Sequence, residues 1–456
     1  MRVLMVSPHP VYSPRGTPIS VFNRCLALCA LGHEIDLVTY PVGQDREVAG
    51  LRYVRANVPG VRSVPVGPSF RKLLLNGAVT IRSLKEALRR QGHYDVVHTH
   101  EEAGLFGPVL ARLGGVPHVY DMGNDWTDVL RNYGLSPHNP ITRMAGALEN
   151  AVIRHSDAII AHFPLIADRV ALSSTTPVHT IFNISLEADP DPDVTSAIRH
   201  AWAPAGSHVL LYSGTLEPYQ GIPLLLASMA DVVQTHPDAV LVILGGRDDQ
   251  VHELGQNVDS LGLTANVRLI GMVPSPLVPA CLKAADVLVS PRERGRNTPL
   301  KIFSYLRSGR PIVATDIASH TQVLDEWSSV LVPPSTQGLA VGIRSLLDDG
   351  PTRHQAIEGA LALETNYGIE RYVSEVARAY AQIGGGETNA AFIGRAADRI
   401  REAAERDRRD PRSQQFLGGL VGRAAGATVT ALLGPAGRGG IGPHADAETD
   451  NEKEAS

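Results

Sequence analysis

The chain is poor in cysteine and carries no strong excess of charge of either sign. Its 456 residues include three cysteines, Cys25, Cys29 and Cys281. Three thiols form neither a disulfide framework nor a four-cysteine metal site, and they suit a reducing compartment. The formal net charge of −5 argues against a nucleic-acid partner, because such proteins present a basic surface. We therefore expect a cytoplasmic protein that does not bind nucleic acid.

Long apolar runs are also missing. A membrane-spanning helix needs about 20 consecutive apolar residues, and no stretch of the sequence approaches that length. The first apolar run, within MRVLMVSPHP, stops at Ser-Pro-His-Pro, which is too early for an export signal. The run is typical of a buried first strand, and any membrane contact is expected to be peripheral.

What the sequence does contain is a repeated alternation of short apolar runs with helical stretches. Such runs in the first part are RVLMVS, EIDLVTY, DVVHTH, PHVYD and AIIAHF. The acidic, proline-bearing stretch 184–206 interrupts the pattern, which resumes with HVLLYSG, AVLVILGG, ADVLVSP and PIVATD. This alternation predicts an α/β fold of parallel sheets covered by helices on both faces. We predict two Rossmann-like doubly wound domains, 1–183 and 184–365, facing each other across a cleft.

The C-terminal part differs from the rest. Residues 366–384, NYGIERYVSEVARAYAQIG, predict one amphipathic helix. Residues 385–456 combine an Arg/Glu/Ala-rich stretch, a Gly/Ala-rich stretch and an acidic end. Because this composition cannot bury a core of its own, we predict a low-complexity tail that is disordered apart from a transient helix. The alternative is that residues 416–433 contact a membrane or a partner.

In each domain, the first predicted strand is followed by a turn that contains glycine. The first, SPRGTPIS, holds Gly16 and Thr17, and the second, GTLEPYQG, holds Gly214, Thr215 and Gln220. Glycine between a strand and a helix lets backbone N–H groups approach a phosphate, and the helix adds its positive end. Either turn alone is more often only a turn, but together they predict that each domain presents a helix N-terminus to the cleft.

A third helix N-terminus is expected in NTPLKIFSYLRSG. Thr298 is predicted to cap the helix, with Pro299 at its first position. The N–H groups of Leu300 and Lys301 would then be free, and Lys301 adds a full charge beside them. The preceding loop contributes three cations: Arg292, Arg294 and Arg296. Any one of these arginines is as readily explained as a solvated loop residue.

Over residues 1–384 the sequence resembles the retaining glycosyltransferases of family four, which have the GT-B fold. The resemblance is carried by SPRGTPIS, DVVHTH, LLYSGTLEPYQGIPLLL, ADVLVSP and PLKIFSYLRSGRPIVATD. It implies transfer of a sugar from a nucleotide-sugar donor held mainly by the C-terminal domain, with the acceptor on the N-terminal domain and no essential metal or other cofactor. It also implies that the helix 366–384 crosses back to the N-terminal domain.

The sequence departs from the family pattern at five positions. Two glutamates that the family usually carries eight positions apart are replaced by Arg296 and Ser304. An arginine and a lysine of the family turn are replaced by Thr215 and Gln220, and a histidine by Gly123. Lost cations at a diphosphate site are costly, since charge-assisted contacts contribute about 1.5–3 kcal/mol each. We interpret the site as rewired, with the loop arginines and Lys301 replacing the lost charge.

The resemblance and the departures together give the expected donor site. No catalytic residue is assigned; Arg296, Lys301 and His100 are the candidates. Residues expected to bind the donor are Gly16, Thr17, Gly214, Thr215, Gln220, Arg292, Arg294, Arg296, Thr298, Pro299, Leu300, Lys301 and Ser304.

Polar residues that follow two strands of the first domain are candidates for the acceptor site. His98 and His100 alternate on one strand, so both point to the same face, and Glu101 follows. Two imidazoles without a third ligand are weak grounds for a metal, and none is expected. We expect His98 to be packed, and His100, Glu101, Asp121 and Asp125 to bind the acceptor. Ordinary helix capping by an aspartate is an equal alternative for the last two.

Residues 51–90 form a basic and apolar segment. They contain nine Lys or Arg residues and one acidic residue, Glu86, with Phe70 and Leu73 to Leu75 among them. Such a segment suits an anionic membrane surface or a lipid-linked acceptor, and a solvated helix face is the alternative.

The sequence thus predicts a glycosyltransferase that moves a sugar from a nucleotide-diphosphate sugar to a glycan or lipid-linked acceptor with retention. Two alternatives stay open. One is a nucleotide-sugar epimerase, which needs a carboxylate pair in the cleft. The other is a catalytically silent homologue that acts as a glycan-binding or scaffold subunit.

Overall fold

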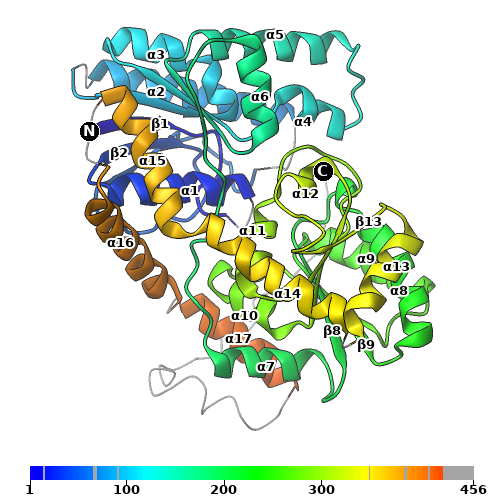
Figure 1. Ribbon diagram of the computed structural model, residues 1–456. Coiled ribbons are helices and arrows are strands. Elements are labelled where there is room, and N and C mark those ends of the chain that lie inside the picture. Colours follow the sequence, from blue (N-terminus) through cyan, green and yellow to red (C-terminus); the bar gives the residue numbers. More distant parts are fainter. Residues whose placement is uncertain are drawn as a thin grey trace, which may run out of the picture.

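The computed structural model describes residues 1–13, 16–64, 69–89, 92–348, 350–384, 388–408 and 411–424 (Figure 1). It contains two parallel sheets, and the first has the strand order β3-β2-β1-β4-β5-β6-β7. Its strands are β1 (Arg2–Val6), β2 (Glu34–Thr39), β3 (Leu51–Arg55), β4 (Val96–His100), β5 (His118–Met122), β6 (Ala158–Ala161) and β7 (Val178–Thr180). The helices are α1 (Gly16–Ala30), α2 (Phe70–Arg89), α3 (Gly107–Gly114), α4 (Trp126–Asn132), α5 (Pro140–Arg154) and α6 (Pro164–Ser173). A short helix, η1 (Glu101–Leu105), follows β4 directly.

The second sheet repeats this plan with the order β10-β9-β8-β11-β12-β13. Its strands are β8 (His208–Ser213), β9 (Ala239–Leu244), β10 (Val267–Gly271), β11 (Val287–Ser290), β12 (Ile312–Thr315) and β13 (Val330–Val332). The helices are α7 (Pro192–Trp202), α8 (Ile222–Thr235), α9 (Asp248–Ser260), α10 (Val278–Ala284), α11 (Leu300–Ser308), α12 (Ala318–Thr321), α13 (Thr336–Leu347) and α14 (Pro351–Glu364). Short helices are η2 (Pro218–Gln220), η3 (Ser275–Leu277) and η4 (Thr365–Tyr367).

Burial on both faces explains why the strands read as continuous apolar runs. Every residue of β9 and β11 is buried, as is every residue of β4 and β5. Helices cover both faces of a parallel sheet, so both sides of each central strand face a core. The prediction of two Rossmann-like doubly wound sheets is confirmed.

The strand order of each sheet indicates where a ligand-binding crevice is expected. In the first sheet the order reverses between β1 and β4, and in the second between β8 and β11. Open α/β sheets bind ligands at such switch points, beyond the carboxyl ends of the strands. The loops that follow these four strands are therefore where the site is expected. They contain most of the residues that the sequence singled out.

The helix α15 (Ile369–Gly384) packs on the first sheet's side of the molecule, although it follows the second sheet in the chain. Its buried residues Tyr372, Val373, Val376 and Tyr380 belong to the same apolar core as α1. Its polar face carries the charged residues Glu370, Arg371, Glu375 and Arg378. The amphipathic pattern of the sequence corresponds to this single helix.

The predicted disorder of residues 385–456 is wrong where the structure describes them. Two helices follow, α16 (Ala390–Arg408) and α17 (Pro411–Ala424). Ile393, Ala396 and Ile400 enter the core shared with α1 and α15, while Phe416 and Leu420 pack on the second domain's core beside α7. The tail needs no core of its own, because it completes those of the two domains. Residues 425–456, and with them part of the predicted 416–433 contact, lie outside the described residues.

Among the described residues, none of the helices combines the length and the apolar character needed to cross a membrane.

Candidate functional site

Glycines bring two loops of the second domain close together at the β8/β11 switch point. Gly221 has φ 73°, and a Cβ there would lie 2.0 Å from the carbonyl oxygen of Pro291, so only glycine fits. The hydroxyl of Tyr212 donates to the carbonyl oxygen of Thr215 at 2.6 Å. These contacts fix the turn after β8 against the loop after β11.

Lys301 lies at the centre of this half of the site. Its amine donates to Oε1 of Gln220 at 3.2 Å and sits 3.9 Å from the ring centroid of Tyr212. A Cβ at Gly214 would come within 2.6 Å of the same amine, so glycine leaves room for it. Burial and the nearby Arg292 guanidinium lower the pKa of Lys301 well below its ordinary value. No carboxylate pairs with this amine among the described residues, so the site favours an anion.

Arg292 shapes the loop rather than reaching into the crevice. It is 2% exposed, and its guanidinium donates to the carbonyl oxygens of Arg294 and Asn297 and to Asn297 Oδ1, at 2.7 to 2.9 Å. The guanidinium also lies 5.1 Å from the ring centroid of Tyr219. Arg292 thus adds positive potential beside Lys301, while Arg294 and Arg296 are exposed.

The helix α11 begins one residue later than predicted. Pro299 occupies the N-cap, with φ −70° and ψ 139°, and Leu300 is the first helical residue. Thr298 does not cap the helix, because Pro299 itself keeps an extended ψ of 139° and the helix begins only at Leu300. Its hydroxyl instead accepts from Nε2 of Gln322 at 3.4 Å. The helix N-terminus still faces the β8/β11 crevice through Lys301, and Ser304 lies one turn further on.

Asp121, at the end of β5, gathers the polar residues of the first domain. Its carboxylate accepts from Arg24 Nε at 3.0 Å and contacts His98 Nε2 at 3.2 Å and His162 Nε2. His100 Nδ1 lies 3.7 Å away. Burial alone would raise the pKa of Asp121, but Arg24 and the imidazoles hold it well below its ordinary value. Asp121 is 1% exposed, so it orients the histidines and does not itself face an acceptor.

The histidines of β4 are both buried. His98 Nδ1 pairs with the Tyr380 hydroxyl of α15 at 2.6 Å, which confirms that His98 is packed. His100 is 2% exposed, and burial lowers its pKa well below the ordinary value. Together with Asp121 the two imidazoles place three possible metal ligands within 4.8 Å of one another. The Arg24 guanidinium already pairs with the same carboxylate, and a metal cation there would be repelled by it.

Glu101 and Asp125 occupy different environments. Glu101 is 6% exposed, has φ 51°, and accepts from Nδ2 of Asn124 at 2.8 Å. Asp125 caps α4 by accepting from the N–H groups of Thr127 and Asp128, and it pairs with Arg169 at 3.1 Å. The capping alternative is therefore confirmed for Asp125.

Direct contacts show that the two halves face each other. Arg296 pairs with Asp128 of α4, with Nε and Oδ2 3.7 Å apart. Gln322 Oε1 accepts from the N–H of Leu165 at 3.1 Å, and its Nε2 donates to the carbonyl oxygen of Arg296 at 2.6 Å. The segments after β5 and β6 therefore lie opposite the loop after β11. Of the predicted donor residues, Arg296 is engaged by the first domain rather than placed beside Lys301.

Sequence reasoning missed Arg24, His162, Asn183 and Gln322. Arg24 carries a signal, because a single charge within the otherwise apolar stretch VFNRCLALCA needs a buried partner. His162 directly follows the apolar run AIIA, the position of a site residue in a parallel sheet. Asn183 and Gln322 give no comparable signal, because their roles depend on contacts between distant segments.

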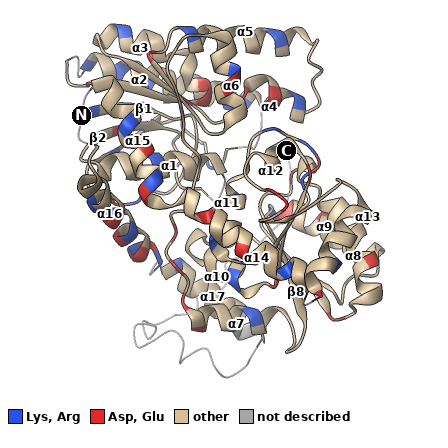
Figure 2. Ribbon diagram, in the orientation of Figure 1, with Lys and Arg blue, Asp and Glu red and all other residues tan. Residues whose placement is uncertain are grey.

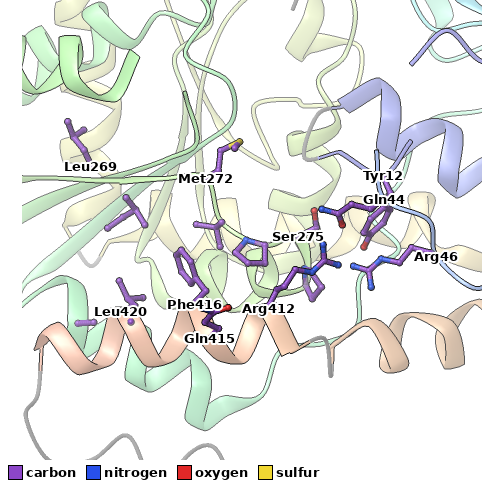
Figure 3. A pocket seen from close by; sticks show the side chains of 16 residues that line it. Tyr12, Gln44, Arg46, Leu269, Met272, Ser275, Arg412, Gln415, Phe416 and Leu420 are labelled. Carbon is purple, nitrogen blue, oxygen red and sulfur yellow. The ribbon is translucent and has the colours of Figure 1, made fainter. Parts of the chain in front are cut away.

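A separate cavity of about 680 Å³ lies between the C-terminal helices and both domains (Figure 3). One side is apolar, with Met272, Phe416 and Leu420, and the other carries Tyr12 and Arg46. Asp407 of α16 accepts from both of the latter residues, at 3.2 and 3.0 Å. None of the predicted donor or acceptor residues lines this cavity.

Two family models match the chain. Residues 16–182 match the glycosyl transferase 4-like domain, and residues 196–362 match the glycosyl transferases group 1. Among curated relatives, a D-inositol 3-phosphate glycosyltransferase 1 of Catenulispora acidiphila is 30% identical over 343 residues, covering 70% of this chain and 80% of the relative. A phosphatidyl-myo-inositol mannosyltransferase of Mycolicibacterium smegmatis is 24% identical, covering 89% of this chain and all of the relative.

Solved structures share the fold. Sucrose-phosphate synthase of Thermosynechococcus elongatus superimposes with a TM-score of 0.69 at 19% identity, covering 84% of this chain and 98% of its own. HepE of Anabaena in complex with UDP-glucose gives a TM-score of 0.61 at 19% identity, with the same coverage of both chains.

Proposed function

Because this chain belongs to the group 1 glycosyltransferases, with the GT-B fold, we propose that it transfers a sugar from a nucleotide-diphosphate sugar to a glycan or lipid-linked acceptor with retention of configuration. The single observation that carries the proposal is Lys301. Its amine lacks an acidic partner among the described residues and lies at a helix N-terminus beside a glycine turn. This arrangement suits a diphosphate.

The chemistry needs stabilisation of the leaving group. Breaking the sugar–phosphate bond builds negative charge on the departing diphosphate, and cations with aligned N–H groups stabilise that charge where it develops. Lys301 and the N–H groups of Leu300 and Lys301 supply this, with Arg292 adding potential from behind. The departing phosphate can take the acceptor's proton, so no strong protein base and no metal are required.

The donor residues divide into three roles under this proposal. Gly214, Thr215 and Gln220 shape the diphosphate site with Lys301, and Gly16 and Thr17 close it from the first domain. Arg296 contacts the first domain across the cleft, and Thr298 accepts from Gln322, which also binds the first domain through Leu165. Among relatives, HepE is in complex with UDP-glucose, which supports a uridine nucleotide as the first donor to test.

A membrane-facing acceptor is supported by one side of the first domain. Phe70, Leu73 and Leu74 of α2 are 75%, 64% and 61% exposed. More exposed apolar residues lie on the neighbouring helices, namely Phe106, Val109 and Leu113 around α3 and Ile141, Met144 and Leu148 on α5. Figure 1 shows these helices along one side, and Figure 2 shows basic residues among them. An apolar surface with basic residues suits an anionic bilayer.

Part of the basic segment is not available to lipids. Arg52 pairs with Asp36 and Glu86, and Lys72 pairs with Glu102 at 3.0 Å. Arg71, Lys85 and Arg89 remain exposed on α2. The proposed location is the cytoplasmic side of a membrane, supported by three cysteines that are all unpaired and buried.

The alternatives are less well supported. An epimerase needs a carboxylate pair in the cleft, whereas Arg296 and Ser304 stand where a family member has its glutamates, and the relatives are named as transferases. A silent scaffold remains a second candidate because Thr215 and Gln220 are neutral. The placement of Lys301 as a replacement cation favours an active site.

Thermal stabilisation by nucleotide sugars tests the proposal. We expect one family among UDP-, GDP-, ADP- and dTDP-sugars to raise the melting temperature, since a ligand at a hundred times its Kd contributes about 2.7 kcal/mol. Lys301→Ala should lose the shift, and Lys85→Ala, a change of an exposed lysine on α2, should keep it. No shift with any donor would contradict the proposed function and favour the scaffold.

A further inference from the structure

At the switch point of its sheet, the first domain presents a carboxyl group that the proposed chemistry does not yet use. Glu101 follows β4, at the switch point of the first sheet. Its neighbours in space, Gly123 and His162, follow β5 and β6. The same two loops continue to Asp128, which pairs with Arg296 of the loop after β11, and to Leu165, whose N–H donates to Gln322 beside that loop. Glu101 therefore lies on the side of the first domain that faces the donor site.

The backbone of Glu101 is strained. Its φ of 51° is in the left-handed region, which non-glycine residues other than Asn and Asp rarely adopt. Strain of this kind persists only where the surrounding structure enforces it, typically at functional sites. The adjacent Glu102 has no such strain and is neutralised by Lys72 at 3.0 Å. Two neighbouring glutamates thus have distinct roles.

The carboxyl of Glu101 is held in a small space over Gly123. A Cβ at position 123 would lie 2.7 Å from Glu101 Oε1 and 2.9 Å from His162 Nδ1. Glycine thus leaves the space that these two side chains fill. Glu101 has no ion pair among the described residues, and its recorded partner is the Asn124 amide at 2.8 Å. Burial, with the neighbouring Glu102, raises the pKa of Glu101 well above its ordinary value.

The ring of His162 is fixed, so it forms a rigid wall beside Glu101. Nδ2 of Asn183 donates to His162 Nδ1 at 3.0 Å, and Oδ1 of Asn183 accepts from the hydroxyl of Ser20. His162 Nε2 therefore carries the proton that is donated to Asp121. Because neither ring nitrogen is left to bind a ligand, Glu101 is the group with hydrogen-bonding capacity to spare.

We propose that Glu101 hydrogen-bonds a hydroxyl of the donor sugar and thereby helps to determine which sugar is transferred. The inference rests on the proposed function, because it places the sugar between Lys301 and the first domain. It also explains Gly123, since a larger residue there would displace the Glu101 carboxyl. A residue that binds a polar group in this way discriminates strongly against a ligand lacking that group.

Glu101→Gly is the most informative variant, because glycine adopts the same φ without strain. UDP and UDP-glucose are titrated calorimetrically into the wild type and the variant, with GDP and GDP-mannose as the second pair. We expect the nucleoside diphosphate to bind within about twofold of wild type and the nucleotide sugar to bind at least about tenfold more weakly. The melting temperature should stay the same or rise, whereas a purely structural role predicts that it falls.

Glu102→Gly is the matched control, since it removes the neighbouring carboxylate and should leave the ratio of the two affinities unchanged. Glu101→Gln supplies a second variant that keeps the side chain's shape. An unchanged ratio of nucleotide-sugar to nucleotide affinity in Glu101→Gly would overturn the inference. Failure of the wild type to bind either pair would instead count against the proposed donor site, and the two failures are distinguished by which protein shows them.

Discussion

The amine of Lys301 lies 3.2 Å from Oε1 of Gln220, so the lysine contacts the very side chain that stands where the family resemblance places a cation. Under the proposed function, the positive charge that the family carries in the turn after β8 is supplied here from the first turn of α11. A residue 81 positions away in sequence thus serves the same region of the crevice.

Removal of the Lys301 charge should weaken nucleotide binding. Lys301→Ala is expected to cost about 1.5–3 kcal/mol in affinity for the nucleoside diphosphate, the range of a charge-assisted contact. Arg296→Ala should cost far less, because Arg296 pairs with Asp128 at an exposed position. Isothermal titration measures both. Equal effects of the two substitutions would show that the charge is not concentrated at Lys301.

Nucleotide binding should take up a proton above neutral pH. The pKa of Lys301 is lowered in the folded protein by burial and by Arg292. A bound diphosphate favours the charged amine and raises that pKa again. Between the lowered pKa and the ordinary value near 10.5, affinity should therefore fall as pH rises. Titration in two buffers of different ionisation enthalpy measures the uptake, and Lys301→Ala should abolish its lysine component.

The free protein should show the opposite dependence on pH from this residue. The unfolded chain binds a proton at Lys301 over the window in which the folded chain does not, so stability rises with pH there. Urea unfolding at several pH values, compared between wild type and Lys301→Ala, isolates this contribution. If Lys301 were charged in the folded state, the free energy of unfolding would depend on pH in the same way in the wild type and in Lys301→Ala.

The C-terminal helices should contribute to stability. Ile400→Ala removes a fully buried side chain of α16 from the core shared with α1 and α15, and should cost about 2–5 kcal/mol. Val341→Ala on α13, where the valine is 52% exposed, should change stability by less than about 1 kcal/mol. Thermal unfolding of both variants provides the comparison. An unchanged stability of Ile400→Ala would indicate that the tail is disordered, as its composition predicts.

Binding to anionic vesicles should depend on α2. Replacing both Leu73 and Leu74 by glutamate should remove most of the binding, because each exposed leucine contributes about 1.5–3 kcal/mol when buried in the bilayer boundary. Leu172→Glu, at a position 90% exposed on α6, is the control. Co-sedimentation with vesicles containing phosphatidylserine is the measurement. Equal loss for the control would indicate a non-specific charge effect.

The fold could be predicted from the sequence because its signal is local. Each strand is a short apolar run, and turn glycines such as Gly221 mark where the chain reverses. The position of Lys301 at a helix start could also be predicted, since it comes two residues after Pro299 at the start of a stretch with helical periodicity. The cap itself could not be predicted, because a Thr-Pro step normally places proline at the first helical position, and nothing local shows that Pro299 instead stays extended.

The remainder of the site depends on contacts between distant segments. Asp121 meets Arg24 and His162 only once β5, α1 and β6 are in place, and nothing in their spacing predicts this. The tail was misjudged for a related reason. Ile393, Ala396, Ala397 and Ile400 recur at helical spacing, but their partners lie on α1 and α15, and the abundance of charge around them concealed the apolar stripe.

The C-terminal helices give the chain a third passage between the domains. The first passage runs from β7 to α7, the second from α14 to α15, and the third from α16 to α17. Two domains joined by three chain connections can move relative to each other in fewer ways than two domains joined by one flexible linker. Opening of the cleft is therefore restricted to a swing that keeps all three connections nearly constant in length, or it requires α17 to leave α7. Under the proposed function, the packing of α17 on α7 therefore limits how far the crevice can open to exchange nucleotide.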